Sequence, residues 1–153
     1  MSDSKKNNDT TVANELKVLL SNLFGLYIKI YKFHWNVSGR EFLGIHKYFQ
    51  ELYEELIEDI DEVAERIRAL GSNAPASLRE FLDRSSINES IGVYPDSNSM
   101  ISELITGYET ISGIIQKIYE SCDAEKDEGT KALISVHQTD YQKNIWFLSS
   151  ILK

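Results

Sequence analysis

The chain has 153 residues, enough for one domain with a sizeable apolar core, and we expect a single domain. Charged residues make up 26% and the net charge is −8, which disfavours generic nucleic-acid binding and fits a solvated surface or one that collects cations. The one cysteine, Cys122, cannot form a disulfide within the chain, and no apolar run suits a membrane span or a secretory signal, so we expect a cytoplasmic protein without membrane attachment.

The N-terminal half of the chain predicts a tail followed by a helical hairpin. Residues 1–10, MSDSKKNNDT, are polar, and we expect a flexible tail there. From about Thr11, apolar residues recur every three or four positions, which predicts a long helix that ends near Ser38-Gly39. A second such pattern covers residues 42–70, and Gly71 is placed to cap its C-terminal end. The turn between them is minimal, so the two helices are expected to pack antiparallel.

The C-terminal half predicts a long connection and a second hairpin. Residues 72–99 contain both prolines, and SLREFLDR within them favours a short amphipathic helix. Apolar periodicity then predicts helices over residues 101–118 and 133–152. The resulting fold class is all-α, a ferritin-like four-helix bundle with a short helix in the long crossover between helices 2 and 3. We expect this domain to span residues 11–153. The expected core positions of the last helix are Leu133, Val136, Tyr141, Ile145, Leu148 and Leu152.

An acidic run, ELYEELIEDIDEVAE, occupies residues 51–65 and contains eight carboxylates and no basic residue. The ordinary interpretation is a solvated helix face. At about 100° per residue, however, His46, Gln50, Asp61 and Glu65 lie within roughly 100° of one another, beside the apolar arc. Asp61 and Glu65 are one turn apart and can hold one cation. Two carboxylates with one histidine suit Fe(II) and leave coordination positions open for an oxidant.

The histidines and carboxylates do not meet within one chain. His46 and Asp61 are fifteen residues apart on one helix, roughly 22 Å, and His34 lies level with His46 across the hairpin. A two-fold axis near Tyr53 and Glu54 would bring each histidine end to the carboxylate end of a second copy and would create two identical sites. None of the three histidines has a Glu three residues earlier, so the Glu-x-x-His motif of ordinary di-iron bundles is absent from the sequence.

The stretch FHWNVSGREFLGIH, residues 33–46, followed by ELYEELIEDIDEVAERIRALG, closely resembles the Dps family of dodecameric miniferritins, and IWFLSSIL near the C-terminus adds to the resemblance. The family pattern of two histidines, two aspartates and a glutamate is matched by His34, His46, Asp61 and Glu65. Gln50 stands where the family has its first aspartate.

The resemblance implies a ferroxidase centre shared between subunits, with His34, Asp61 and Glu65 as catalytic residues and His46 as a further metal ligand. Such centres oxidise Fe(II) to Fe(III), preferentially with hydrogen peroxide, and a homo-oligomeric shell of twelve subunits stores the ferric mineral. Gln50 is expected to make a weak second iron position because a neutral amide cannot offset a cation's charge. Trp35 is an auxiliary candidate that accepts oxidising equivalents, with ordinary packing as the alternative.

Two further groups of residues have competing interpretations. Asp123, Asp127 and Glu128 precede the last helix, where family members place acidic residues that line pores admitting iron, and helix capping is the alternative. We expect a structural role for His137.

Two alternative functions remain at this point. One is a Dps-type nucleoid protein that protects DNA through a lysine-rich tail, which the balanced charges of Asp3, Lys5, Lys6 and Asp9 disfavour. The other is a metal-binding shell in which Gln50 has impaired ferroxidase activity. Peroxide consumption coupled to Fe(II) oxidation separates that shell from an active ferroxidase.

Overall fold

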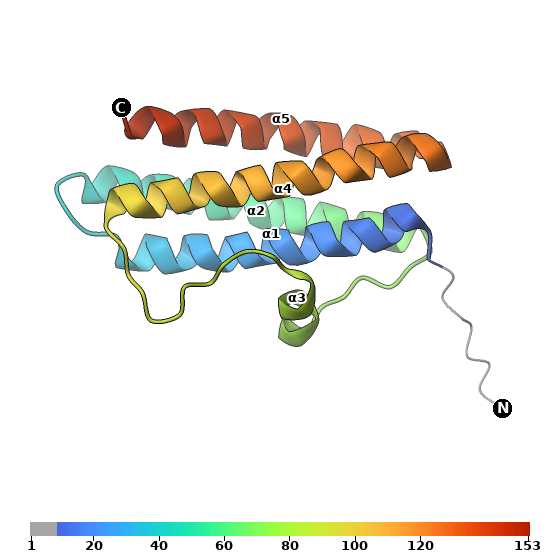
Figure 1. Cartoon of the computed structure of the whole chain (residues 1–153), viewed down its shortest axis with the longest axis horizontal. Coiled ribbons are helices and arrows are strands. Elements are labelled where there is room, and N and C mark those ends of the chain that lie inside the picture. The colour runs from blue at the N-terminus through green and yellow to red at the C-terminus, as the bar shows by residue number, and fades with distance from the viewer. Residues whose placement is uncertain (1–8) are drawn as a thin grey trace.

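The structure, a computed structural model, describes residues 9–153 and forms a bundle of four long helices with one short helix outside it (Figure 1). The part of the chain that is described contains no strand. The all-α prediction, including the short helix in the crossover, is confirmed. The five helices are α1 (Thr11–Asn36), α2 (Phe42–Ala69), α3 (Leu78–Arg84), α4 (Ser97–Glu125) and α5 (Glu128–Ile151).

The α1–α2 hairpin begins and ends at defined caps. The hydroxyl of Thr10 accepts a hydrogen bond from the backbone N–H of Ala13 and starts α1. Gly39, with φ of +114°, makes the tight turn that leads into α2. At the other end of α2, Gly71 has φ of +85°, and the N–H of Ser72 bonds to the carbonyl of Ile67 at 3.2 Å. The positive φ and this bond form the C-terminal glycine cap that the sequence predicts.

The predicted tail begins outside the described residues, because the structure describes the chain only from Asp9. The carboxylate of Asp9 forms an ion pair with Lys17 at 2.6 Å and accepts a hydrogen bond from the hydroxyl of Ser72. The division into a tail of ten residues and a folded domain stays a prediction.

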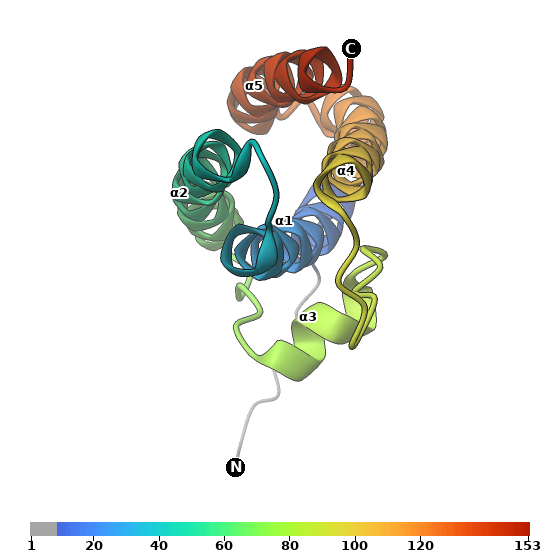
Figure 2. The ribbon, with the colours of Figure 1, turned by 90° about the vertical axis from the view of Figure 1, so that its left-hand side faces the viewer.

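The crossover runs along the outside of α1 (Figures 1 and 2). Ser77 and Glu80 form a capping box that starts α3, each bonding the other's backbone N–H. Phe81 of α3 stacks on Phe24 of α1 with ring centroids 4.5 Å apart. Further along, the buried Asn22 of α1 accepts a hydrogen bond from the N–H of Ser86 at 2.9 Å. These contacts hold the long connection against the bundle.

Viewed end-on, the four long helices surround one core in the order α1, α2, α5, α4 (Figure 2). The predicted apolar faces of α1, α2 and α4 are buried, with the exception of Phe42 at the start of α2 and the half-buried Leu70 at its end. The prediction for α5 is wrong at two positions. Val136 is 60% exposed and Leu152 is also exposed, while Ile134 is buried.

The buried face of α5 explains this error. Its six buried residues include three polar ones, so the apolar residues alone do not mark the face that points inward. The six residues are Thr130, Ile134, His137, Tyr141, Asn144 and Leu148.

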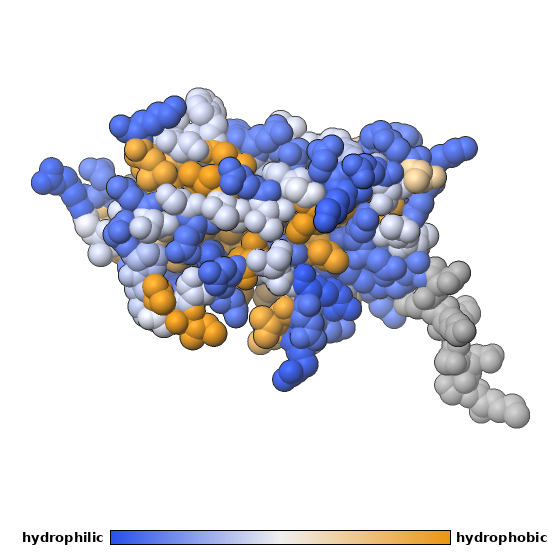
Figure 3. All heavy atoms as spheres, in the orientation of Figure 1, coloured by the Kyte–Doolittle hydropathy of each residue, from blue (hydrophilic) through white to orange (hydrophobic). Residues whose placement is uncertain are grey.

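Apolar side chains also remain on the surface, gathered on the crossover and near the C-terminal end of α5 (Figure 3). The crossover exposes Leu78, Leu82, Val93 and, at 87%, Ile91. Exposed apolar patches with polar surroundings are typical of protein–protein contacts. Across residues 9–153, none of the helices has both the length and the apolar character that crossing a membrane requires.

Candidate metal centre

His34 of α1 and His46 of α2 lie face to face. Their rings stack with centroids 3.8 Å apart and planes inclined by 17°. The Nδ1 of each ring is 2.7 Å from the backbone carbonyl oxygen of the other residue. A carbonyl oxygen only accepts hydrogen bonds, so each Nδ1 carries a proton, and in the neutral ring the lone pair is then on Nε2. Both rings are thus fixed in the tautomer that can bind a metal.

The hairpin turn produces this arrangement. The two histidines are twelve residues apart in the sequence, and the turn at Gly39 brings the end of α1 level with the start of α2. His34 is buried and His46 is half-buried. The structure therefore brings together the two predicted imidazole ligands within one chain.

The predicted carboxylate ligands lie elsewhere. Asp61 and Glu65 are both exposed, one turn apart, fifteen or more residues beyond His46 along α2. Within residues 9–153, the one convergent group of three potential metal ligands includes neither them nor the two stacked histidines. A shallow hollow beside Asp61 is lined in part by the apolar residues Ile57 and Ala64. The two groups of predicted ligands, which we call the histidine half-site and the carboxylate half-site, therefore lie apart within one chain.

Gln50 is half-buried and follows His46 by one helical turn. Its side-chain nitrogen donates a hydrogen bond to the carboxylate of Glu54 at 2.7 Å. The amide oxygen of Gln50, which carries no net charge, is the atom of this side chain that can bind a cation.

A series of aromatic contacts leads from Trp35 to the histidine pair. The ring of Trp35 is 5.1 Å from that of Tyr31, which stacks on Tyr53 at 4.1 Å. Tyr53 in turn meets His34 edge-to-face at 5.2 Å. Trp35 itself is 69% exposed. It is thus connected to the imidazoles through two tyrosines.

The three predicted pore residues do not all precede α5, because Asp123 lies in the last turn of α4, Asp127 is the N-cap of α5 and Glu128 is its first residue. Asp127 caps α5 by accepting a hydrogen bond from the backbone N–H of Thr130 at 2.9 Å. It also forms an ion pair with Arg66 of α2 at 2.7 Å. Burial opposes its ionisation, but the hydrogen bonds from Thr130 and the Arg66 guanidinium hold the pKa of Asp127 below its ordinary value. Asp123 pairs with Lys131, and Glu128 is exposed. Capping therefore accounts for Asp127, and the pore role of the three residues stays a prediction.

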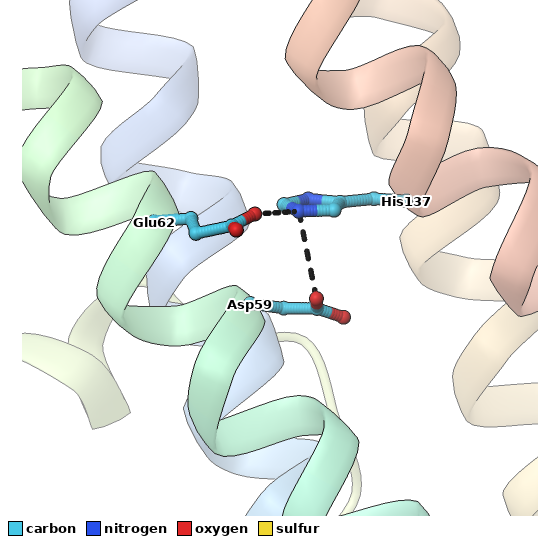
Figure 4. Close-up of side chains that lie close together, drawn as sticks. All are labelled: Asp59, Glu62 and His137. Atoms are coloured by element: carbon cyan, nitrogen blue, oxygen red, sulfur yellow. Dashed lines mark hydrogen bonds and ion pairs between the residues drawn. The ribbon is translucent and has the colours of Figure 1, made fainter.

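The sequence analysis missed one group of side chains, Asp59, Glu62 and His137 (Figure 4). The Nε2 of His137 is 2.8 Å from Glu62 and 3.5 Å from Asp59. The carboxylates come from α2 and the imidazole from α5, 75 residues further on. Burial raises the pKa of Asp59, although His137 and a hydrogen bond from Tyr141 oppose that rise. Local spacing gives no sign of this group, because its members meet only after the bundle has formed.

Comparisons with known proteins identify the family of the chain. The chain matches the Ferritin family, described as a ferritin-like domain, over residues 13–153. It is 35% identical over 128 residues to DNA protection during starvation protein 2 of Bacillus anthracis, which covers 83% of this chain and 86% of that protein. It is 30% identical over 148 residues to the DNA protection during starvation protein of Brevibacillus brevis, covering 94% and 99% of the two chains.

Solved structures give the same result. The Dps protein of Vibrio cholerae O1 superposes with a TM-score of 0.89 at 34% identity, over 93% of this chain and 89% of that one. That protein is described as a member of a broad superfamily of ferritin-like diiron-carboxylate proteins. The bundle and the family match thus define a ferritin-like protein. Within that class, the chain belongs to the Dps family. This membership supports iron binding and ferroxidase-type chemistry in general.

Proposed function

We propose that this protein is an iron-storing miniferritin that removes hydrogen peroxide. It oxidises Fe(II) to Fe(III) at centres shared between two subunits, prefers hydrogen peroxide as the oxidant, and stores the ferric mineral in a cytoplasmic shell of twelve subunits. The observation that carries the proposal is the reciprocal bonding of His34 and His46, which leaves both Nε2 atoms ready for a cation.

Each complete centre combines the histidine end of one chain with the carboxylate end of another. A two-fold axis near Tyr53 and Glu54 would set α2 antiparallel to its symmetry copy, so one dimer would contain two equal centres. His34 with Asp61 and Glu65 of the other chain supplies an imidazole and two carboxylates for the first Fe(II). This ligand set matches the hard-to-borderline character of Fe(II) and offsets its charge.

The exposed apolar residues near the half-sites support a contact between copies. Trp35 and Leu43 flank the histidine end, and Ile57 lies beside Asp61. All three are exposed in a single chain, and burying them against a second copy would be favourable. The same contact would exclude bulk water from the centre.

The oxidation is balanced by two iron ions and one peroxide. Each Fe(II) gives one electron to hydrogen peroxide, the O–O bond breaks, and two protons complete two water molecules. His46 and Gln50 would hold the second Fe(II) weakly, because both ligands are neutral. Trp35, connected through Tyr31 and Tyr53, is a candidate acceptor for oxidising equivalents that escape the iron pair.

Stopped-flow absorbance of the ferric product tests this function. We expect Asp61→Ala or Glu65→Ala to abolish rapid peroxide-driven oxidation and His46→Ala to slow it moderately. Glu120→Gln is the matched control, since Glu120 is an exposed acid on α4, outside the proposed ligand set. Full activity of Asp61→Ala in intact shells would refute the shared centre. Iron binding without peroxide consumption in the wild type would instead support a storage shell disabled by Gln50.

DNA protection is part of the names of the curated relatives. We propose that this chain does not bind DNA directly, because its net charge is −8. The tail residues that bear on this point, apart from Asp9, lie outside the described part of the structure.

A further inference from the structure

A second group of potential metal ligands lies between α2 and α5, separate from both half-sites. We propose that Asp59, Glu62 and His137 bind one divalent transition-metal cation within a single chain. All three can direct one ligand atom to a common region, with the atoms within 4.8 Å of one another (Figure 4). This site does not depend on the proposed ferroxidase activity or on a partner subunit.

The distances fit a small cation. Ligand atoms about 2.1 Å from a tetrahedral ion lie about 3.4 Å from one another. The His137 Nε2 is 2.8 Å from the Glu62 oxygen and 3.5 Å from the Asp59 oxygen. Small side-chain rotations therefore suffice to place an ion between the three atoms.

The charges and donor types also fit. Two carboxylates offset the charge of a divalent cation, and one imidazole beside two carboxylates suits Fe(II), Zn(II) or Mn(II). One Nε2–H can serve only one carboxylate well, yet both carboxylates approach the same nitrogen. A cation would satisfy all three groups together.

The surroundings hold two of the ligands in place. The ring of His137 is 1% exposed, so packing holds it in place, although its Nδ1 has no hydrogen-bond partner among the described residues. The second oxygen of Asp59 accepts a hydrogen bond from the buried hydroxyl of Tyr141 at 2.7 Å, the kind of contact that orients a metal-binding carboxylate. Glu62 is exposed, which gives an ion a route from solvent. The site therefore combines a fixed interior part with an accessible ligand.

The helical register separates this site from the half-site on the same helix. Asp59 and Asp61 are two residues apart, a rotation of about 200°, so they face nearly opposite sides of α2. Asp59 is buried toward α5, whereas Asp61 is exposed. One helix thus presents carboxylates to two different metal environments.

Zn(II) is the probe for this proposal because it has no redox chemistry and its binding is independent of peroxide turnover. Crystals of the full-length wild-type protein, soaked in Zn(II), should show an anomalous peak between Asp59, Glu62 and His137. In calorimetric titrations, Glu62→Gln should lose one Zn(II) per chain or weaken that binding by at least about tenfold. Asp59→Asn should weaken Zn(II) binding in the same way. The amide oxygen of the new Asn side chain can still accept the hydrogen bond from Tyr141, so the variant keeps that contact.

Glu58→Gln is the matched control, with the same change of charge at an exposed position on the same helix. It should bind Zn(II) like the wild type. Circular dichroism establishes that all variants remain helical. Absence of the anomalous peak, or equal Zn(II) stoichiometry and affinity for Glu62→Gln and Glu58→Gln, would show that the group is a metal-free histidine–carboxylate cluster. If the wild type proves to have no ferroxidase activity, the expected Zn(II) results remain the same. The two proposals can therefore be refuted independently.

Discussion

The side-chain amide of Gln50 donates a hydrogen bond to the carboxylate of Glu54 at 2.7 Å. The two residues are one helical turn apart and flank the proposed second iron position after His46. The amide oxygen, a neutral and weak iron ligand, is the only atom of Gln50 that can bind a metal, and the bond to Glu54 orients the amide that carries it.

Gln50→Asp is expected to strengthen the second iron position. The added carboxylate lowers the repulsion between two nearby cations, and we expect Fe(II) binding there to tighten on the order of tenfold. Peroxide-driven oxidation should become faster at low iron. Stopped-flow absorbance and anaerobic Fe(II) titration measure the two effects. Gln116→Glu, which adds the same charge at an exposed site on α4, is the control. Unchanged rate and stoichiometry in Gln50→Asp would contradict the division into a strong and a weak position.

The assembly is expected to contain twelve chains, since each proposed centre needs a partner and the chain belongs to the Dps family. Light scattering coupled to size exclusion should give roughly twelve times the 17.5 kDa mass of the chain. A folded monomer that binds Fe(II) through His34, Asp61 and Glu65 would be incompatible with this prediction.

DNA binding is expected to be absent at about physiological salt, because an anionic protein repels a polyanion and has few unpaired basic groups to displace the counterions of DNA. A gel-shift titration should show no retardation. A variant without residues 1–8 is the informative comparison, because it keeps Asp9 and the Thr10 cap. Tight binding by the full chain that this deletion removes would show that the tail had been misjudged.

Asp127→Asn is expected to destabilise the fold by about 1 kcal/mol at neutral pH, because the variant loses the charged partner of Arg66 while it can still cap α5. The pKa of Asp127 lies below its ordinary value when the protein is folded. Its contribution is therefore complete above the unfolded pKa near 3.8 and declines as the pH falls through the lower, folded value.

Melting temperatures measure this effect. The difference between the wild type and Asp127→Asn should narrow as the pH falls below about 4. Glu128→Gln, at the exposed neighbouring position, should change the melting temperature little at any pH. If the difference in melting temperature stays constant as the pH falls well below about 4, the ion pair between Asp127 and Arg66 contributes little to stability.

The hairpin was predictable because its signals are local. Apolar periodicity defines α1 and α2, glycines mark both turns, and the spacing of His34 and His46 places the imidazoles level with each other. Even so, the sequence does not reveal the reciprocal Nδ1–carbonyl bonds. They depend on the rotation of both helices about their axes, which packing fixes.

The last helix was harder to predict, and the reason is physical. Its buried face alternates apolar residues with His137, Asn144 and Thr130, so the periodicity of apolar residues is weak there. Asp59 and Glu62 likewise look like ordinary members of an acidic surface run. Their partners are supplied by a helix 75 or more residues away, and no local pattern contains that information.

The pairs between α2 and α5 also determine how these two helices can align. Glu62 meets His137, Asp59 meets Tyr141, and Glu55 meets Asn144 at 3.0 Å. Each pair joins unlike groups in antiparallel order, and each lies one turn beyond the last. A slip of α5 by one turn would set the carboxylate at one end of this series against Ile134 or Leu148 and leave one polar group of α5 without its partner, whereas leucine contacts would tolerate such a slip. The polar side of the bundle thus selects one register for α5, a specificity that its apolar core does not provide by itself.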